Sequence, residues 1–137
     1  MALTLEEANR IAQGAMAKAK DLNIRISVAV CDAGGRLMVF QRMDNAIWAS
    51  AYGSQGKAVA SAAFGRPSGE LAERATQPTP AGIAAAEGGH MIMGQGGAGS
   101  ARRRNRECLW GGRRYRPAGR GLCTSWGGKT IRASRRA

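Results

Sequence analysis

The sequence has only one histidine and three cysteines, none of them in a C-x-x-C pair. Because His90 is alone, one chain cannot by itself build a two-histidine metal site, a catalytic triad or a facial site of histidine and carboxylate. The odd number of widely spaced cysteines does not suggest a disulfide framework. A reducing cytoplasm is therefore the compartment that we expect.

Hydrophobic runs long enough to cross a bilayer are also missing from the sequence. The chain opens on the pattern of a capped amphipathic helix, without the basic and apolar regions of a secretory signal. We therefore expect a cytoplasmic protein that does not enter the membrane.

Negative charge is scarce in one part of the chain only. Residues 1–95 hold nine basic and eight acidic side chains, whereas residues 96–137 hold twelve basic side chains and the single acid Glu107. The net charge of +12 therefore comes almost entirely from the last part of the chain. We divide the chain into an α/β domain, residues 1–97, and an Arg/Gly-rich tail, residues 98–137.

The tail shows neither the alternation of a strand nor the 3.6-residue stripe of a helix. Its only aliphatic side chains larger than alanine are Leu109, Leu122 and Ile131. Because so little apolar surface cannot offset the entropy of ordering the chain, we predict that the tail is disordered or irregular.

Local patterns in the domain predict a helix followed by a hairpin. Thr4 and Glu7 form a capping box ahead of an amphipathic stripe, which predicts a helix that runs to about Leu22. Apolar residues alternate over residues 24–31, and a returning strand is predicted over residues 36–42. Between them stands the turn sequence D-A-G-G, so the whole segment predicts a β-hairpin.

A second helix is predicted to follow, ended by Gly65 and Pro67. Trp48 and Tyr52, one turn apart, mark one face of this helix, and we expect them to pack it on the sheet. The later predictions are a short helix over 68–74, a loop over 77–80, a helical turn over 83–87 and a third strand over 90–93.

Residues 32–37 (DAGGRL) and 42–44 (RMD) resemble the D-x-G-G-x-L…R-M-D hairpin of the GlcG/HbpS family, which contains haem-binding and haem-degradation-associated proteins. Residues 57–58 (KA) and 63–68 (AFGRPS) resemble the end of a helix in that family. The resemblance covers about residues 3–97. It implies a profilin-like α+β fold, in which helices pack on an antiparallel sheet, and assembly into a homo-oligomer.

The resemblance also implies a small-molecule ligand, with haem as the expected cofactor. Arg42, Lys57 and Arg66 stand at motif positions, where cations could bind haem propionates or another small carboxylate, or could equally make structural hydrogen bonds. His90 is the candidate metal ligand, and the alternative is a histidine near a sheet edge. Residues 4–22 lack the histidine that ligates haem in some family members.

Other side chains that could contact a ligand have a structural explanation. We expect Met43, Met91 and Met93 to fill the core rather than to face haem iron. We expect Cys31 to be a small buried residue rather than a nucleophile, because no base lies near it in the sequence.

After Gly97 the chain departs from the family, and the basic tail replaces the family's last strand and helix. We interpret the tail as an out-of-frame translation. Codons for residues 109–116, read one base later, permit Gly-Ala-Val-Gly-Val, which resembles the missing strand. The alternative is an RNA-binding arm, whose arginines meet phosphates while Trp110, Tyr115 and Trp126 stack on bases. In either case the tail can bind polyanions without specificity.

The sequence therefore predicts a ligand-binding protein of GlcG/HbpS type rather than an enzyme, with haem or a similar hydrophobic carboxylate as its ligand. Two alternatives stay open. One is an enzyme or accessory factor in hydroxy-acid or aromatic catabolism that uses Lys57 and Arg66 on a carboxylate substrate. The other is nucleic-acid binding through the tail.

Overall fold

The structure is a computed structural model that describes residues 2–94, 98–99, 108–110, 113–115 and 123–126. Its elements, in chain order, are α1 (Leu5–Asp21), β1 (Ser27–Cys31), β2 (Leu37–Arg42), α2 (Ala49–Phe64), the 3-10 helix η1 (Ser68–Arg74), α3 (Pro78–Ala86), β3 (Ala98–Gly99), β4 (Cys108–Trp110), β5 (Arg113–Tyr115) and β6 (Cys123–Trp126).

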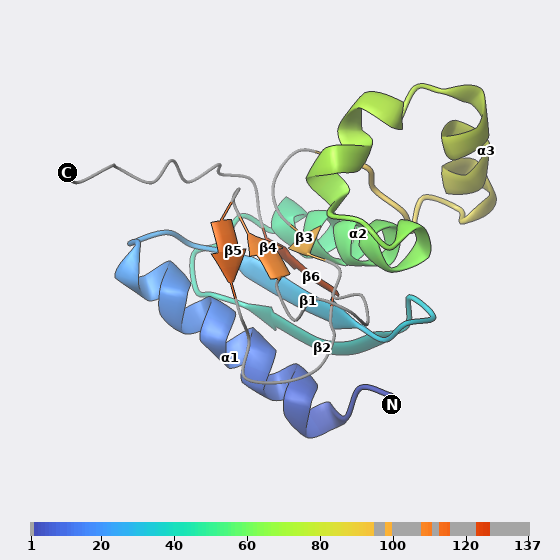
Figure 1. Ribbon diagram of the computed structural model, residues 1–137. Helices are drawn as coiled ribbons and strands as arrows, with labels where there is room; N and C mark the ends of the chain where they lie inside the picture. The colour runs from blue at the N-terminus through green and yellow to red at the C-terminus, as the bar shows by residue number, and fades with distance from the viewer. Residues whose placement is uncertain (1, 95–97, 100–107, 111–112, 116–122, 127–137) are drawn as a thin grey trace.

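The main sheet has the strand order β2-β1-β6-β3, and its neighbouring strands are antiparallel. β4 and β5 form a separate antiparallel pair. α1 lies on one face of the main sheet and α2 on the other (Figure 1). This arrangement confirms the predicted α+β architecture, with helices packed on an antiparallel sheet.

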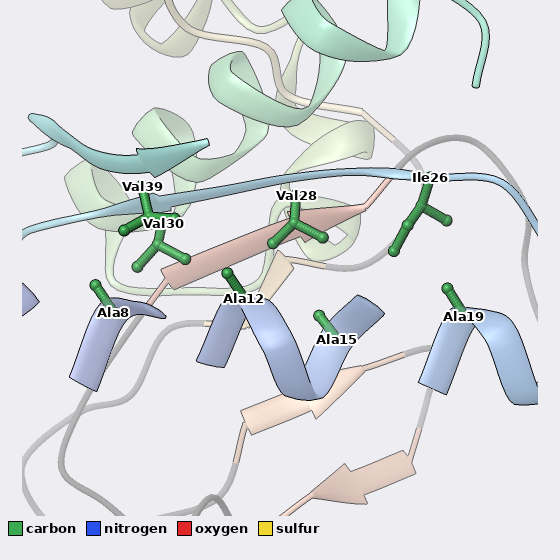
Figure 2. Close-up of a cluster of buried hydrophobic side chains, with 8 residues drawn as sticks. All are labelled: Ala8, Ala12, Ala15, Ala19, Ile26, Val28, Val30 and Val39. Carbon is green, nitrogen blue, oxygen red and sulfur yellow. The ribbon is translucent and has the colours of Figure 1, made fainter. Parts of the chain in front are cut away.

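Helix α1 packs on the sheet through a stripe of alanines. The predicted capping box is present: the Glu7 amide donates to Thr4 Oγ1 at 3.2 Å, and the Thr4 amide donates to Glu7 Oε2 at 3.1 Å. The alanines let the helix approach the sheet closely, while branched side chains fill the space between them. Figure 2 shows this cluster, which consists of Ala8, Ala12, Ala15, Ala19, Ile26, Val28, Val30 and Val39.

The turn between β1 and β2 has the predicted chemistry. Asp32 Oδ1 accepts hydrogen bonds from the backbone amides of Gly34 and Arg36, at 2.8 and 2.9 Å. Gly35 has a φ of +76°, in the left-handed region that favours glycine. The β-hairpin prediction is therefore confirmed.

Residues beyond the α/β domain complete the main sheet. β6 pairs with β1, with Cys123 opposite Cys31 and Trp126 opposite Val28, and β3 pairs with the other edge of β6. β1 is thus an interior strand, which explains why all its residues are buried. Most of the tail lies outside the described residues, so its disorder, its altered reading frame and its RNA-binding arm stay predictions.

The predicted orientation of α2 is wrong. Trp48 and Tyr52 are 71% and 69% exposed. The helix instead turns its small or polar side chains inward: Ser50, Ser54, Lys57, Ala58 and Ser61. The reason lies on the strand, because β1 presents only Ser27, Ala29 and Cys31 to this helix. A helix face of small residues fits closely against such a surface, whereas large aromatic rings would hold the helix away.

Two predictions between α2 and the tail are also wrong. Residues 77–80, predicted as a loop, include the start of α3, where Pro78 occupies a first-turn position that needs no backbone donor. Residues 90–93, predicted as a strand, have no regular secondary structure, since the Ile92 amide donates to the Gly56 carbonyl of α2 at 3.0 Å. The short helix predicted over 68–74 is confirmed as η1.

A buried pair of hydroxyl groups joins α2 to β1. Ser50 Oγ donates to the Ile47 carbonyl at 2.6 Å and lies 2.6 Å from Ser27 Oγ, so Ser27 is the donor in the second contact. Ser50→Ala is expected to lower the free energy of unfolding by about 1–3 kcal/mol, because Ser27 loses its buried acceptor. Replacing both serines with alanine should recover most of that loss. Urea unfolding of the single and the double variant measures both changes in the free energy of unfolding. If the double variant loses as much stability as Ser50→Ala, the two hydroxyl groups are not paired.

Candidate ligand-binding site

The candidate site centres on Lys57, the one charged residue of α2. Its side chain lies on the sheet-facing side of the helix and is only 9% exposed. Burial separates the ammonium group from water, so the pKa of Lys57 is lowered from its ordinary value. A carboxylate placed beside this amine would favour its charged form again. Lys57 is therefore suited to bind an anionic group.

Residues 91–94 cross α2 beside this lysine. Gly56 permits the crossing, because a Cβ at this position would lie 2.5 Å from Cγ1 of Ile92. Gly94 then brings the backbone so near that its own Cβ would lie 3.4 Å from Cε of Lys57. Gly56 thus makes room for the Ile92 side chain, and Gly94 brings backbone to the end of the Lys57 side chain.

A hydroxyl group without a partner lies one helical turn from Lys57. Ser61 is fully buried, and its Oγ has no hydrogen-bond partner within the part of the chain that the structure describes. Leaving such a group unsatisfied costs about 1–3 kcal/mol, and a bound ligand oxygen would remove that cost. Ser61 was not predicted as a site residue, although its spacing of one turn from Lys57 could have indicated it.

An apolar cluster borders the same part of α2. Met91 is 6% exposed and packs with buried Ala60 and Leu71. Half-buried side chains surround these three, namely Val59, Phe64, Ala84 and Met93. Met43 packs against the α1 cluster on the other face of the sheet. The assignment of all three methionines to the core is confirmed.

The other three predicted site residues lie on the surface. Arg42 Nη1 donates to the Ala46 carbonyl at 3.3 Å and so closes the loop between β2 and α2. Arg66 is exposed just after the end of α2. His90 is exposed after α3. These three residues are therefore exposed, whereas Lys57 is buried.

Cys31 lies on the side of β1 that faces α2 and is 2% exposed. Burial, and then the nearby charge of Asp32, raise the pKa of the Cys31 thiol to about 11. The thiol is therefore protonated at neutral pH and is a weak nucleophile. The predicted structural role of Cys31 is confirmed.

Within the described ranges, histidine, cysteine and carboxylate side chains do not gather in groups of three that could hold a metal ion. Over the same ranges, no helix combines the length and hydrophobicity that crossing a membrane requires. The ligand chemistry of the described site is that of an amine, a hydroxyl group and apolar side chains.

The sequence profile of the family described as "Haem degrading protein HbpS-like" matches residues 3–101. The match ends shortly after Gly97, where a departure from the family was predicted. No individually curated protein matches the chain.

Solved structures share this fold. The protein ORFY of Klebsiella pneumoniae has a TM-score of 0.69 at 23% identity, over 95% of this chain and 81% of its own. A double mutant of Streptomyces reticuli HbpS has a TM-score of 0.68 at 23% identity, over 92% and 74%. PduOC, solved in complex with haem, has a TM-score of 0.68 at 23% identity, over 95% and 86%. The TM-scores show a common fold, and at identities this low the likeness shows the fold alone.

Proposed function

We propose a function on the premise that the chain belongs to the HbpS-like family: it binds haem, or a similar hydrophobic ligand with a carboxylate, beside Lys57. The observation that carries this proposal is the buried side chain of Lys57, whose end lies against the backbone of Gly94. The family description names haem degradation, and the related PduOC structure contains haem, which supports haem as the ligand class.

The side chains at this site fit such a ligand. Lys57 and Ser61 can both donate to the oxygens of a propionate, and the buried Ser61 hydroxyl would then gain a hydrogen-bond partner. At the border of that cluster, half-buried Val59 and Phe64 supply apolar side chains for a hydrophobic ring. Haem, when bound, supplies a redox-active iron, while the residues of this chain orient the ring and its carboxylates.

The remaining predicted contacts enter the proposal in a secondary role. His90, exposed after α3, is the proposed iron ligand. Arg66 is the proposed contact for a second carboxylate, whereas Arg42 already donates to a backbone carbonyl. We also propose that the protein acts in the cytoplasm and self-associates, as the family resemblance implies.

Titration of the full chain with haemin tests this proposal. In about 0.5 M salt, which screens the charges of the basic tail, we expect a saturable shift of the Soret band. His90→Ala should alter the position of that band, while iron-free protoporphyrin still quenches protein fluorescence in both proteins. A Soret band that never shifts would refute haem binding, and stabilisation by a small carboxylate metabolite would then favour the catabolic alternative.

A further inference from the structure

Strand β6 brings a cysteine of the tail opposite a cysteine of the domain. β6 pairs antiparallel with β1, and in this register Cys123 stands directly opposite Cys31 (Figure 1). The third cysteine, Cys108, lies in β4, which belongs to the other sheet, and its register partner is Tyr115. Among the described strands, Cys31 and Cys123 are therefore the only two cysteines that share a register position.

The spacing of paired strands suits a disulfide bond at this position. Residues directly opposite each other in an antiparallel pair lie on the same face of the sheet, with both their Cα and their Cβ atoms about 4.5–5.5 Å apart. A disulfide usually joins Cα atoms about 4.4–6.8 Å apart and Cβ atoms about 3.5–4.5 Å apart. The Cα spacing therefore fits already, and the Cβ spacing fits once the two strands move slightly closer at this point.

Cys31 is held in place for such a bond. It lies in an interior strand of the sheet, with β2 paired to the other edge of β1. It packs with Ala29 and Ala58 and is 2% exposed. Because this packing already restrains the side chain, little conformational entropy is lost when it becomes bonded.

We propose that Cys31 and Cys123 form a disulfide bond that fastens β6 to β1 when the chain meets a small-molecule disulfide. The thiolate of one cysteine attacks the small-molecule disulfide, which releases one small thiol and leaves a mixed disulfide on the chain. The thiolate of the other cysteine then attacks the protein sulfur of that mixed disulfide and releases the second small thiol. Two protein thiols are thereby oxidised to one disulfide, and the small-molecule disulfide is reduced to two thiols, which take up the two protons. This inference goes beyond ligand binding and does not depend on it.

The burial of Cys31 sets the conditions under which the bond forms. When Cys123 reacts first, Cys31 has only to attack its register partner, so the oxidant need not reach the buried thiol. The thiolate is the attacking species, and burial raises the pKa of Cys31 to about 11. The bond should therefore form slowly at neutral pH and faster at alkaline pH. In a reducing cytoplasm both thiols should stay reduced until an oxidant is present.

Peptide mapping of the oxidised full chain tests the proposal. Dilute protein is treated with oxidised glutathione at about pH 8.5, the ordinary pKa of a cysteine, and is then alkylated and digested with trypsin. The three cysteines fall into separate tryptic peptides, residues 26–36, 107–113 and 121–129. We expect 26–36 to be linked to 121–129 in the monomer band of a non-reducing gel. Random encounters would instead link 26–36 to 107–113 as readily, and that result would overturn the proposal. So would a map without linked peptides, or linkage found only between separate chains.

Two variants separate the proposed pair from the remaining cysteine. Cys108→Ser should keep the linkage of 26–36 to 121–129, whereas Cys123→Ser should abolish it. In the wild type, oxidation should raise the Tm by roughly 10 °C, because a bond across so long a loop restricts the unfolded chain. Dithiothreitol should reverse this rise. An equal rise in oxidised Cys123→Ser would contradict the assignment. The wild-type peptide map needs no substitution, so the proposal can be tested even when a variant does not fold.

Discussion

Replacing Lys57 with methionine is expected to weaken haemin binding at least tenfold without lowering the stability of the fold. A hydrogen bond from a charged donor contributes about 1.5–3 kcal/mol, which corresponds to roughly ten- to a hundredfold in affinity. Methionine has a similar length and no charge, so the buried position no longer has to accommodate an ammonium group. Haemin titration and thermal unfolding of the variant measure the two effects.

The same substitution should change how stability depends on pH. The folded-state pKa of Lys57 lies below its ordinary value of 10.5, because burial disfavours the charged form. The unfolded chain therefore binds this proton more tightly than the folded chain, and the stability contributed at this position is present above pH 10.5 and lost as the pH falls through the folded-state pKa. Relative to Lys57→Met, the wild type should gain stability as the pH rises toward 10.5.

Lys18→Met is the control for both measurements. Lys18 lies exposed in the last turn of α1, so its loss removes the same charge from the chain without affecting the buried site. It should leave haemin affinity unchanged. If Lys57→Met binds haemin as tightly as Lys18→Met, the amine of Lys57 does not contact the ligand.

Replacing Gly56 with alanine is expected to destabilise the fold by about 1–3 kcal/mol, the usual cost of overpacking a close contact. The new methyl group would lie 2.5 Å from Cγ1 and 2.9 Å from Cβ of Ile92. Because a β-branched side chain cannot easily rotate away, residues 91–94 must move off α2. Their displacement would also carry Gly94 away from Lys57, so haemin affinity should fall together with stability.

Gly82→Ala is the matched substitution for Gly56→Ala. Gly82 lies inside α3, where an added Cβ would meet nothing within 4 Å. Here alanine should raise the free energy of unfolding by up to about 1 kcal/mol, because glycine is a poor helix former. The two variants should thus differ by about 1–4 kcal/mol in urea unfolding. A Gly56→Ala protein as stable as Gly82→Ala would show that Ile92 does not pack against α2.

The parts of the fold that the sequence predicted correctly rest on contacts between near neighbours. The capping box of α1 joins Thr4 to Glu7, and the hairpin turn is closed by Asp32 within the following few residues. Such hydrogen bonds form in the same way in any fold, because the bonded groups are only a few residues apart in the sequence.

The wrong predictions concern residues whose conformation or burial depends on contacts with residues far away in the sequence. The amide of Ile92 donates to the Gly56 carbonyl of α2. The sequence pattern of residues 90–93 could not reveal this hydrogen bond. Trp48 and Tyr52 were expected inside because they are the largest apolar side chains of their helix. They lie outside because β1 leaves no room for them.

Motif positions located Lys57 in the sequence but did not show its environment. Its burial, its lowered pKa and its neighbour Gly94 follow from the crossing of residues 91–94 over α2. Ser61 was missed for a related reason, since an unpaired hydroxyl can be recognised only when the surroundings of the helix are known.

The lack of a second histidine limited the metal sites that one chain can build before any fold was known. The sequence by itself also determined α1, the β-hairpin and the family, because these depend on residue type and short spacing. Only the tertiary structure decided which side of α2 faces the sheet. That choice depends on the small side chains that β1 presents, Ser27, Ala29 and Cys31. It both buries Lys57 and exposes Trp48 and Tyr52.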